Sequence, residues 1–143
     1  MLPVPYDVTT AITTHLVLSD SLTEDVFVEL GYHAADPYAL NARFSQGDGP
    51  PSTWLLARDL FAQGLVATQA APAGRGDVRI WRDEDPDYLL MTFRGVAGEA
   101  LIAAPAEPIE RFMEATRAIV PFGAESERIG AAVDAFVESL LTA

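Results

Sequence analysis

The sequence contains no cysteine and no lysine, because all nine of its basic residues are arginine. Without cysteine, the chain has no thiolate nucleophile, no disulfide, no iron–sulfur ligand and no zinc cluster of the cysteine type. Without lysine, it has no Schiff-base amine, no P-loop lysine and no lysine general base. These absences exclude several catalytic classes, and the lack of cysteine fits a reducing cytoplasm.

Basic charge is also scarce, since 21 acidic residues in a chain of 143 leave a net charge of −12. The arginines are scattered between Arg43 and Arg128. Phosphate backbones and anionic membranes attract clustered cations. This charge balance therefore disfavours nucleic acids and membrane surfaces as partners. No apolar run approaches the roughly 20 residues that cross a bilayer, and no signal sequence is visible at Met1–Pro5. We expect a cytoplasmic protein of one domain, residues 1–143, without membrane insertion.

Period-two patterning predicts strands in the first two thirds of the chain. Four strands are expected before residue 57, a short helix at 57–63 ends at Gly64, and three strands follow. The small residues of 67–76 predict a mobile surface loop, and the last two strands, apolar on both faces, should be covered on both sides. The expected strands are 8–18, 26–33, 38–44, one ending at Trp54–Leu56, 78–82, 88–94 and 99–104.

Helical spacing replaces this alternation in the final third. Pro108 suits a first helical turn, and Pro121 ends the helix. A second helix is expected from about Glu125, with an apolar stripe formed by Ile129, Val133, Phe136 and Leu140. This stripe either docks on its own domain or fits a groove on a partner. The order of strands and helices indicates an α+β fold.

No pattern of metal-binding or catalytic residues stands out. His15 and His33 lie on polar faces of predicted strands, without a cluster of carboxylates. Residues 83–87 begin like a calcium loop, but Tyr88 and Arg94 replace the required glycine and glutamate, so a solvated turn is expected. No serine lies in a Gly-x-Ser-x-Gly elbow. The sequence leaves open whether the fold brings two carboxylates together, as glycoside hydrolysis requires.

Aromatic residues recur through the predicted sheet, each near a charge. Core and sheet packing is the simpler interpretation. The alternative is a protein interface, because aromatic residues and arginine make up many hot spots, and Trp81 with Arg79 would then share one surface. The residues are Tyr32, Tyr38, Trp54, Phe61, Trp81, Tyr88 and Phe93.

Several motifs follow one another in a recognisable order. They are Tyr32–Leu40 (YHAADPYAL), Trp54–Leu60 (WLLARDL) closing on Gly64-Leu65, Gly76–Trp81 (GDVRIW), Gly98–Leu101 (GEAL), Ala104-Pro105, Phe112 and Val120-Pro121. Between about Val8 and Pro121 the chain resembles the SsgA-like family of actinomycete sporulation and cell-division regulators. It departs from the family at His33, where an acid is usual, in the 83–87 loop and after Gly123.

The resemblance implies a non-enzymatic adaptor without a cofactor. Such a protein recruits or supports the tubulin-like protein FtsZ, alongside other septation proteins, at sites of sporulation-type division, and is concentrated at division septa in the cytoplasm. The implied fold is a seven-stranded twisted antiparallel sheet with a barrel-like core and three helices, similar to whirly and mitochondrial RNA-binding proteins. The implied assembly is a homotrimer.

The matched motifs supply candidate residues for partner binding or for folding. Asp36-Pro37 alternatively sets a turn, and Arg58 and Asp59 alternatively pair within the short helix. The candidates are Tyr32, Asp36, Pro37, Tyr38, Trp54, Arg58, Asp59, Asp77, Arg79 and Trp81. A second function, binding of single-stranded nucleic acid by aromatic stacking, is opposed by the acidic charge. A third, a small-molecule-binding domain or hydrolase, requires a deep pocket with perturbed acids.

Overall fold

The computed structural model describes residues 5–142, except the side chains of Arg128 and Ala132. It confirms the expected α+β class, with a seven-stranded antiparallel sheet and three helices. The strands are β1 (Val8–Ser19), β2 (Leu22–Tyr32), β3 (Ala39–Ser45), β4 (Ser52–Ala57), β5 (Val78–Arg82), β6 (Tyr88–Gly95) and β7 (Gly98–Pro105). The helices are α1 (Arg58–Gly64), α2 (Ala106–Ile119) and α3 (Glu125–Leu141).

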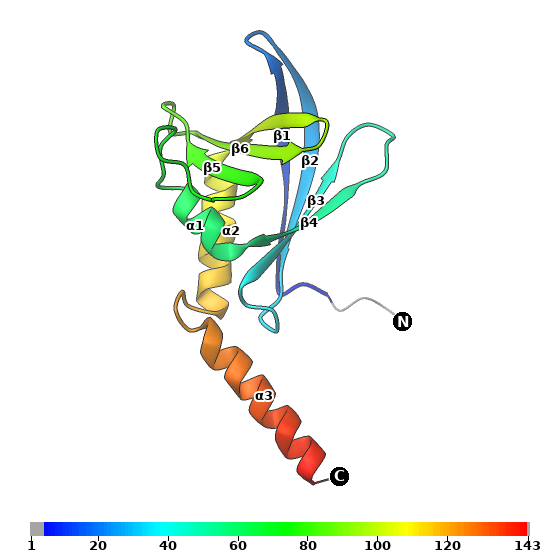
Figure 1. Ribbon diagram of the computed structural model, residues 1–143, viewed down its shortest axis with the longest axis vertical. Coiled ribbons are helices and arrows are strands. Elements are labelled where there is room, and N and C mark those ends of the chain that lie inside the picture. The colour runs from blue at the N-terminus through cyan, green and yellow to red at the C-terminus, as the bar shows by residue number, and fades with distance from the viewer. Residues whose placement is uncertain (1–4, 143) are drawn as a thin grey trace.

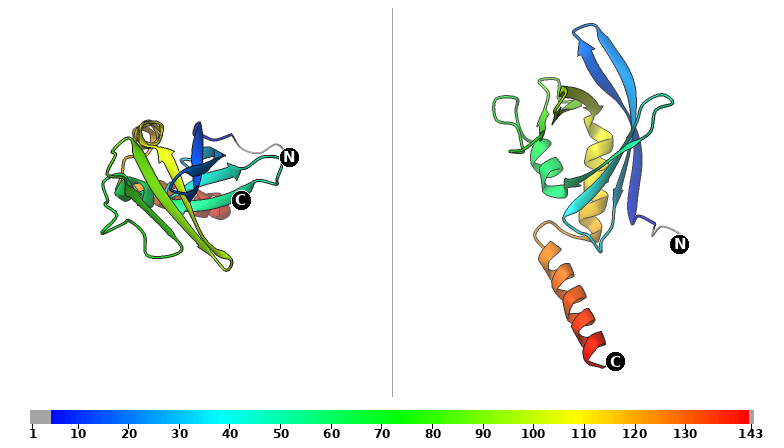
Figure 2. Two further views of the ribbon diagram at one scale, coloured as in Figure 1. Left: turned by 90° about the horizontal axis from the view of Figure 1, so that it is seen from above. Right: turned by 45° about the vertical axis from the view of Figure 1, so that its right-hand side comes forward.

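The sheet runs in the order β4-β3-β2-β1-β7-β6-β5, and it curls so that its two halves face each other (Figures 1 and 2). The two halves join where β1 pairs with β7 through only His15↔Ala103 and Leu16↔Ile102. A short junction lets the strongly twisted ribbons diverge on either side of it. The sheet therefore remains open, with β4 and β5 as its edges.

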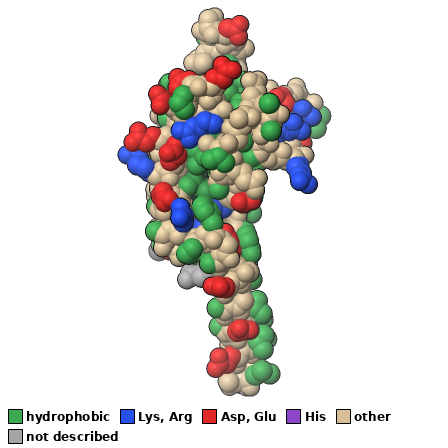
Figure 3. Space-filling model, turned by 90° about the vertical axis from the view of Figure 1, so that its left-hand side faces the viewer, with side chains coloured by type: hydrophobic (Ala, Val, Ile, Leu, Met, Phe, Trp, Pro, Cys, Tyr) green, Lys and Arg blue, Asp and Glu red, His purple; other side chains and the backbone are tan. Residues whose placement is uncertain are grey.

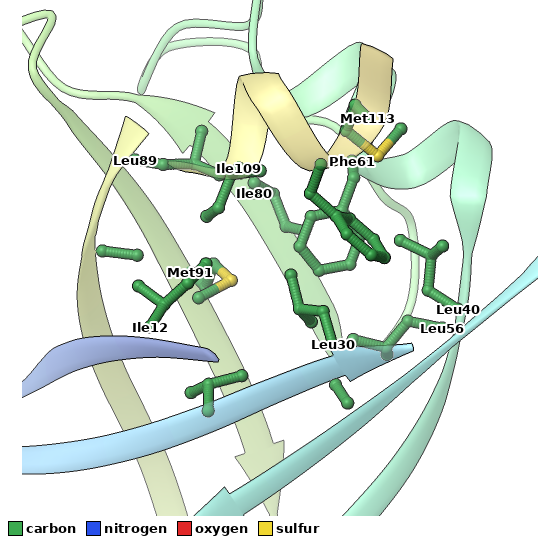
Figure 4. Close-up of a cluster of buried hydrophobic side chains, with 14 of the residues drawn as sticks. Ile12, Leu30, Leu40, Leu56, Phe61, Ile80, Leu89, Met91, Ile109 and Met113 are labelled. Atoms are coloured by element: carbon green, nitrogen blue, oxygen red, sulfur yellow. The ribbon is translucent and has the colours of Figure 1, made fainter. Parts of the chain in front are cut away.

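The core fills the concave side of the sheet, where α2 lies across the strands (Figures 1 and 4). Alternate residues of the strands point inward, as the period-two pattern requires. From the other side, α2 contributes one face of its 3.6-residue repeat. The buried residues of α2 are Ala106, Ile109, Phe112, Met113 and Thr116.

The segment after α1 is fastened to β5 and does not form the free loop expected for 67–76. Ala73 and Ile80 exchange two backbone hydrogen bonds of 2.8 and 3.0 Å, and the Arg82 N–H donates to the Ala67 carbonyl at 3.0 Å. Gly74 allows this close approach: its φ is +98°, and a Cβ there would meet the Val78 carbonyl. The outer side of β5 is thus already occupied by the chain itself.

The last helix, α3, projects away from the sheet and from α2 (Figure 1). A turn at Gly123, with φ +92°, separates it from the end of α2. Of the two alternatives for its apolar stripe, docking on its own domain is therefore excluded for the described residues, and a partner's groove remains. Ile129, Val133, Phe136 and Leu140 are between 40% and 63% exposed.

Candidate interaction surfaces

No group of three or more histidine, cysteine, aspartate or glutamate side chains that could hold a metal occurs in residues 5–142. His15 contacts Asp25 at 3.1 Å, and the His33 ring lies 4.3 Å from the Tyr6 ring. In the acidic loop, the Asp85 carboxylate accepts a hydrogen bond from the Asp87 N–H at 3.1 Å. That loop is an exposed hydrogen-bonded turn, in line with the sequence prediction.

The ten candidate residues do not converge on one site. Tyr32 and Pro37 are buried, and the Tyr32 hydroxyl donates to the Pro37 carbonyl at 3.0 Å, which fastens the turn between β2 and β3. Trp81 is only 8% exposed, so it packs in the core, as the simpler interpretation expected, and the alternative of a surface shared by Trp81 and Arg79 is excluded. The candidates on the surface are Asp36, Tyr38, Trp54, Asp59, Asp77 and Arg79.

Arg58 is the most deeply enclosed charged residue, with 1% of its surface exposed. Its Nη1 donates to the carbonyls of Thr116 at 3.4 Å and Val120 at 2.7 Å, at the C-terminal end of α2. Its Nη2 donates to Oε1 of Glu125 at 2.5 Å, at the start of α3. One guanidinium thus binds two carbonyls where α2 ends, of which Thr116 also accepts the Val120 N–H, and links this helix end to the first residue of α3.

Two rings and the helix ends surround this guanidinium. The Arg58 Cζ lies 5.1 Å from the centroid of the Tyr32 ring and 4.5 Å from that of Phe122, both within cation–π range. Asp59 bonds to Gln63 instead of pairing with Arg58, so the predicted Arg58–Asp59 pair is wrong. We call Arg58 with Thr116, Val120 and Glu125 the Arg58 clamp.

The Arg58 clamp shifts the titration of Glu125. The hydrogen bond from the Arg58 guanidinium lowers the pKa of the Glu125 carboxyl, although burial partly opposes this. Backbone N–H groups of Glu125 and Gly123 also lower the pKa. The carboxylate therefore stays ionised, and the ion pair stays intact, to a lower pH than for an ordinary glutamate.

The first candidate surface is the apolar stripe of α3. Hydrophobic side chains line one side of the projecting helix (Figure 3). Ile129, Val133, Phe136 and Leu140 are separated by four, three and four residues, the spacing of a coiled-coil seam. An amphipathic helix without a partner on its apolar face is a surface for association.

The second candidate surface is an aromatic cleft on the concave side, near the free ends of the β3–β4 and β6–β7 hairpins. The Phe93 ring of β6 meets Phe44 and Trp54 edge to face, at centroid distances of 5.3 and 5.2 Å. These contacts bring the two halves of the curled sheet together. Beside them lies an open, mainly apolar cleft of about 250 Å³, which Leu16 and Ile102 also line.

The fold is an open, curled antiparallel sheet around one helix. Its surface carries an apolar helix face and an aromatic cleft, which are features of a protein that binds other proteins. The family model "Streptomyces sporulation and cell division protein, SsgA" matches residues 26–125, and the chain belongs to this family.

Curated relatives agree with this assignment. The chain is 40% identical over 112 residues to the sporulation-specific cell division protein SsgB of Streptomyces coelicolor, covering 77% of this chain and 79% of that protein. It is 34% identical over 141 residues to SsgB of Salinispora tropica, covering 96% and 94%. These relatives support a role in cell division.

Solved structures match as well. The SsgA-like sporulation-specific cell division protein of Thermobifida fusca superposes with a TM-score of 0.81 at 30% identity, over 97% of this chain and 98% of that one. An SsgB structure, described with mutations in SsgB that correlate to longitudinal cell division during sporulation of S. coelicolor, gives a TM-score of 0.78 at 36% identity, over 85% of this chain and 94% of that one. The expected fold is confirmed by both.

Sequence reasoning missed the partners of Arg58 and the role of Phe44. Arg58 and Glu125 are 67 positions apart, and no local spacing links them. Phe44 lies within a predicted strand, where nothing in the alternation identifies a partner on the opposite half of the sheet. A weak signal for the Arg58 clamp existed, since the segment Val120–Glu125 combines a helix end with an acid.

Proposed function

We propose that this protein is a non-enzymatic adaptor of cell division that recruits or supports FtsZ at septation sites during sporulation-type division. The observation that carries the proposal is membership of the SsgA family, with SsgB relatives aligned over most of the chain. The proposal places the protein in the cytoplasm, concentrated at septa, with no cofactor. Among residues 5–142, no helix is long and apolar enough to span a membrane.

We also infer that residues 1–143 form one domain, because strands from both halves of the chain share one sheet and one core.

In this proposal, the adaptor binds FtsZ through several copies of one weak binding site, one on each subunit of an oligomer. We propose that copies associate through the α3 stripe, since the 4-3-4 spacing of its apolar residues matches a seam between helices. That three copies form the assembly is what the family resemblance implies. Each trimer would present the same FtsZ-binding site three times. Linked sites raise the effective concentration, so overall binding exceeds that of a single site.

The competing prediction, single-stranded nucleic-acid binding, is weakened by how the arginines are used. Arg94, Arg111 and Arg117 each contact a glutamate on the surface, at 3.3, 3.8 and 3.0 Å. Arg82 contacts Glu110 at 2.7 Å. Cations paired in this way do not form a stripe that follows a phosphate backbone.

Sedimentation with polymerising FtsZ tests the proposal. FtsZ purified from S. coelicolor is polymerised with GTP and centrifuged with this protein at moderate salt. We expect the protein in the pellet only when FtsZ polymers are present. Absence from the pellet, together with retention of labelled single-stranded oligonucleotides on a filter, would contradict the adaptor function and favour its competitor.

A further inference from the structure

The edge strand β4 lacks the features that normally protect a sheet edge. Natural edge strands carry charges, bulges or covering segments that prevent pairing with another chain. The sequence of β4, STWLLA, contains no charged residue, and its pairing with β3 runs without a shift from Ala39↔Ala57 to Phe44↔Ser52. Leu55 is 65% exposed in the middle of the strand. The strand is therefore a regular, apolar and uncharged edge.

The register identifies which backbone groups of β4 face outward. Opposite residues in an antiparallel pair alternate between hydrogen-bonded and non-hydrogen-bonded positions. Just beyond the strand, Arg58 donates its N–H to the Tyr38 carbonyl at 2.7 Å, which continues the pairing of Ala57 with Ala39. The even-numbered residues of β4 therefore bond to β3, and the N–H and C=O groups of Thr53, Leu55 and Ala57 point away from it.

The outward groups of Thr53 and Leu55 have no hydrogen-bond partner within residues 5–142, because neither the backbone bonds outside the ladders nor the side-chain bonds reach them. Ala57 contributes only its N–H, since it is the N-cap of α1 and its carbonyl accepts the first hydrogen bond of that helix. The opposite edge differs, because β5 exchanges hydrogen bonds with Ala73 and Ala67. A continuous sheet from β4 of one copy to β5 of the next is thus blocked, and pairing of β4 with β4 of a second copy is the alternative that the exchange experiment below tests.

The side chains beside this edge indicate what such a strand would carry. Ser52 and Trp54 line the aromatic cleft on the concave side. A strand added to β4 would place alternate side chains on that side, next to Trp54. The cleft is mainly apolar and β4 is uncharged, so the side chains that fit there are apolar and uncharged.

We propose that β4 is a docking edge for an extended segment of a partner protein, which adds to the sheet as an eighth strand. The outward N–H and C=O groups of Thr53 and Leu55, together with the Ala57 N–H, provide the backbone hydrogen bonds. The cleft beside Trp54 selects apolar residues at alternate positions. This inference goes beyond the adaptor function, and it holds whether or not FtsZ is the partner.

The probe is a displayed library of random peptides selected on the full-length protein. Amide hydrogen exchange is measured with and without each selected peptide. In the free protein, the Thr53 and Leu55 amides should exchange fast, and those of Trp54 and Leu56, bonded to β3, slowly. Bound peptides should be apolar at alternate positions and should slow exchange at Thr53, Leu55 and Ala57.

Two substitutions at one position separate backbone pairing from side-chain contact. Leu55→Pro removes an outward N–H without breaking the ladder with β3, because proline is tolerated on a free edge. It should weaken peptide binding about tenfold or more, since it removes a hydrogen bond and places a ring at the edge. Leu55→Thr keeps the N–H and a strand-forming side chain, so it should retain most of the binding.

Three results would overturn the proposal. The first is that the library yields no peptide that wild-type protein binds. The second is that Leu55→Pro binds the selected peptides as well as Leu55→Thr, or that both lose binding equally. The third is that the Thr53 and Leu55 amides are already protected in the free protein and lose protection on dilution, which would show that β4 pairs with a second copy. Circular dichroism confirms that both variants fold.

Discussion

At the scale of single residues, Arg58 joins parts of the chain that are far apart. Its guanidinium is bound by two carbonyls of α2 and by Glu125, and it is almost wholly enclosed. Removing the guanidinium takes the side-chain donor from the Val120 carbonyl and the positive partner from the Glu125 carboxylate, and loss of one partner of a buried ion pair is costly. The fold therefore depends on this arginine more than on any of the exposed ion pairs.

Replacing Arg58 with alanine should lower the free energy of unfolding by about 3–5 kcal/mol. The reason is the loss of the donor at the end of α2 together with the loss of the positive charge that pairs with the Glu125 carboxylate. Urea unfolding at neutral pH measures the change. Arg117→Ala is the matched control, because the Arg117–Glu114 pair is exposed and should contribute less than about 1 kcal/mol. Equal losses in the two variants would contradict the role assigned to Arg58.

The Arg58 clamp should also make stability depend on pH. A carboxyl with a lowered pKa in the folded state stabilises the fold above its unfolded pKa of about 4.3. That contribution is lost as the pH falls through the lower folded value. Glu125→Gln should therefore be less stable than wild type at pH 7, and the difference should shrink in titrations below about pH 4. A difference that stays constant with pH would exclude this linkage.

Gly64 shows how closely α1 and β5 approach. A Cβ at this position would overlap the side chain of Ile80, which is fully buried. Gly64→Ala should destabilise the protein by about 1–3 kcal/mol, because overpacking outweighs the gain in helix propensity. In contrast, Gly130→Ala in exposed α3 meets no atom within 4 Å and should be neutral or stabilising. Thermal unfolding of the two variants compares them, and a stabilised Gly64→Ala protein would refute the close approach.

At the scale of elements, the sequence predicts the strands and helices, because local periodicity controls where they form. The fifth strand has the predicted bounds, Val78–Arg82, and the last helix begins at Glu125 as expected. Local patterns do not encode contacts between distant segments. The Arg58 clamp and the fastening of residues 67–73 to β5 both depend on such contacts, so the first was missed and the second was predicted as a free loop.

The exposed stripe of α3 allows folding and association to be separated. Phe136 is 63% exposed, so Phe136→Ser should change the stability of an isolated subunit by no more than about 0.5 kcal/mol. The same substitution should abolish self-association if copies meet along the stripe. Light scattering reports the mass and circular dichroism the fold. Ser139→Ala, at an exposed polar position on α3, serves as the control and should leave the assembly intact.

At the scale of the whole molecule, the curled sheet holds the core, and the projecting helix offers a surface for association. The sheet and α2 form the core, whereas α3 and the β4 edge lie outside it (Figures 1 and 4). The net charge of −12 disfavours nucleic acid as the partner, and the apolar stripe and aromatic cleft suit proteins. The α3 stripe lies outside the packed core, so it can be altered without unfolding the protein, whereas the aromatic cleft shares Val26 and Ile102 with the core.

The central claim is that the protein multiplies a weak site by self-association. Size-exclusion chromatography with light scattering tests it directly. The account predicts a species of three times the 15.4 kDa chain mass at micromolar concentration, and a monomer for Phe136→Ser. A wild-type protein that stays monomeric over the whole accessible concentration range would contradict the account.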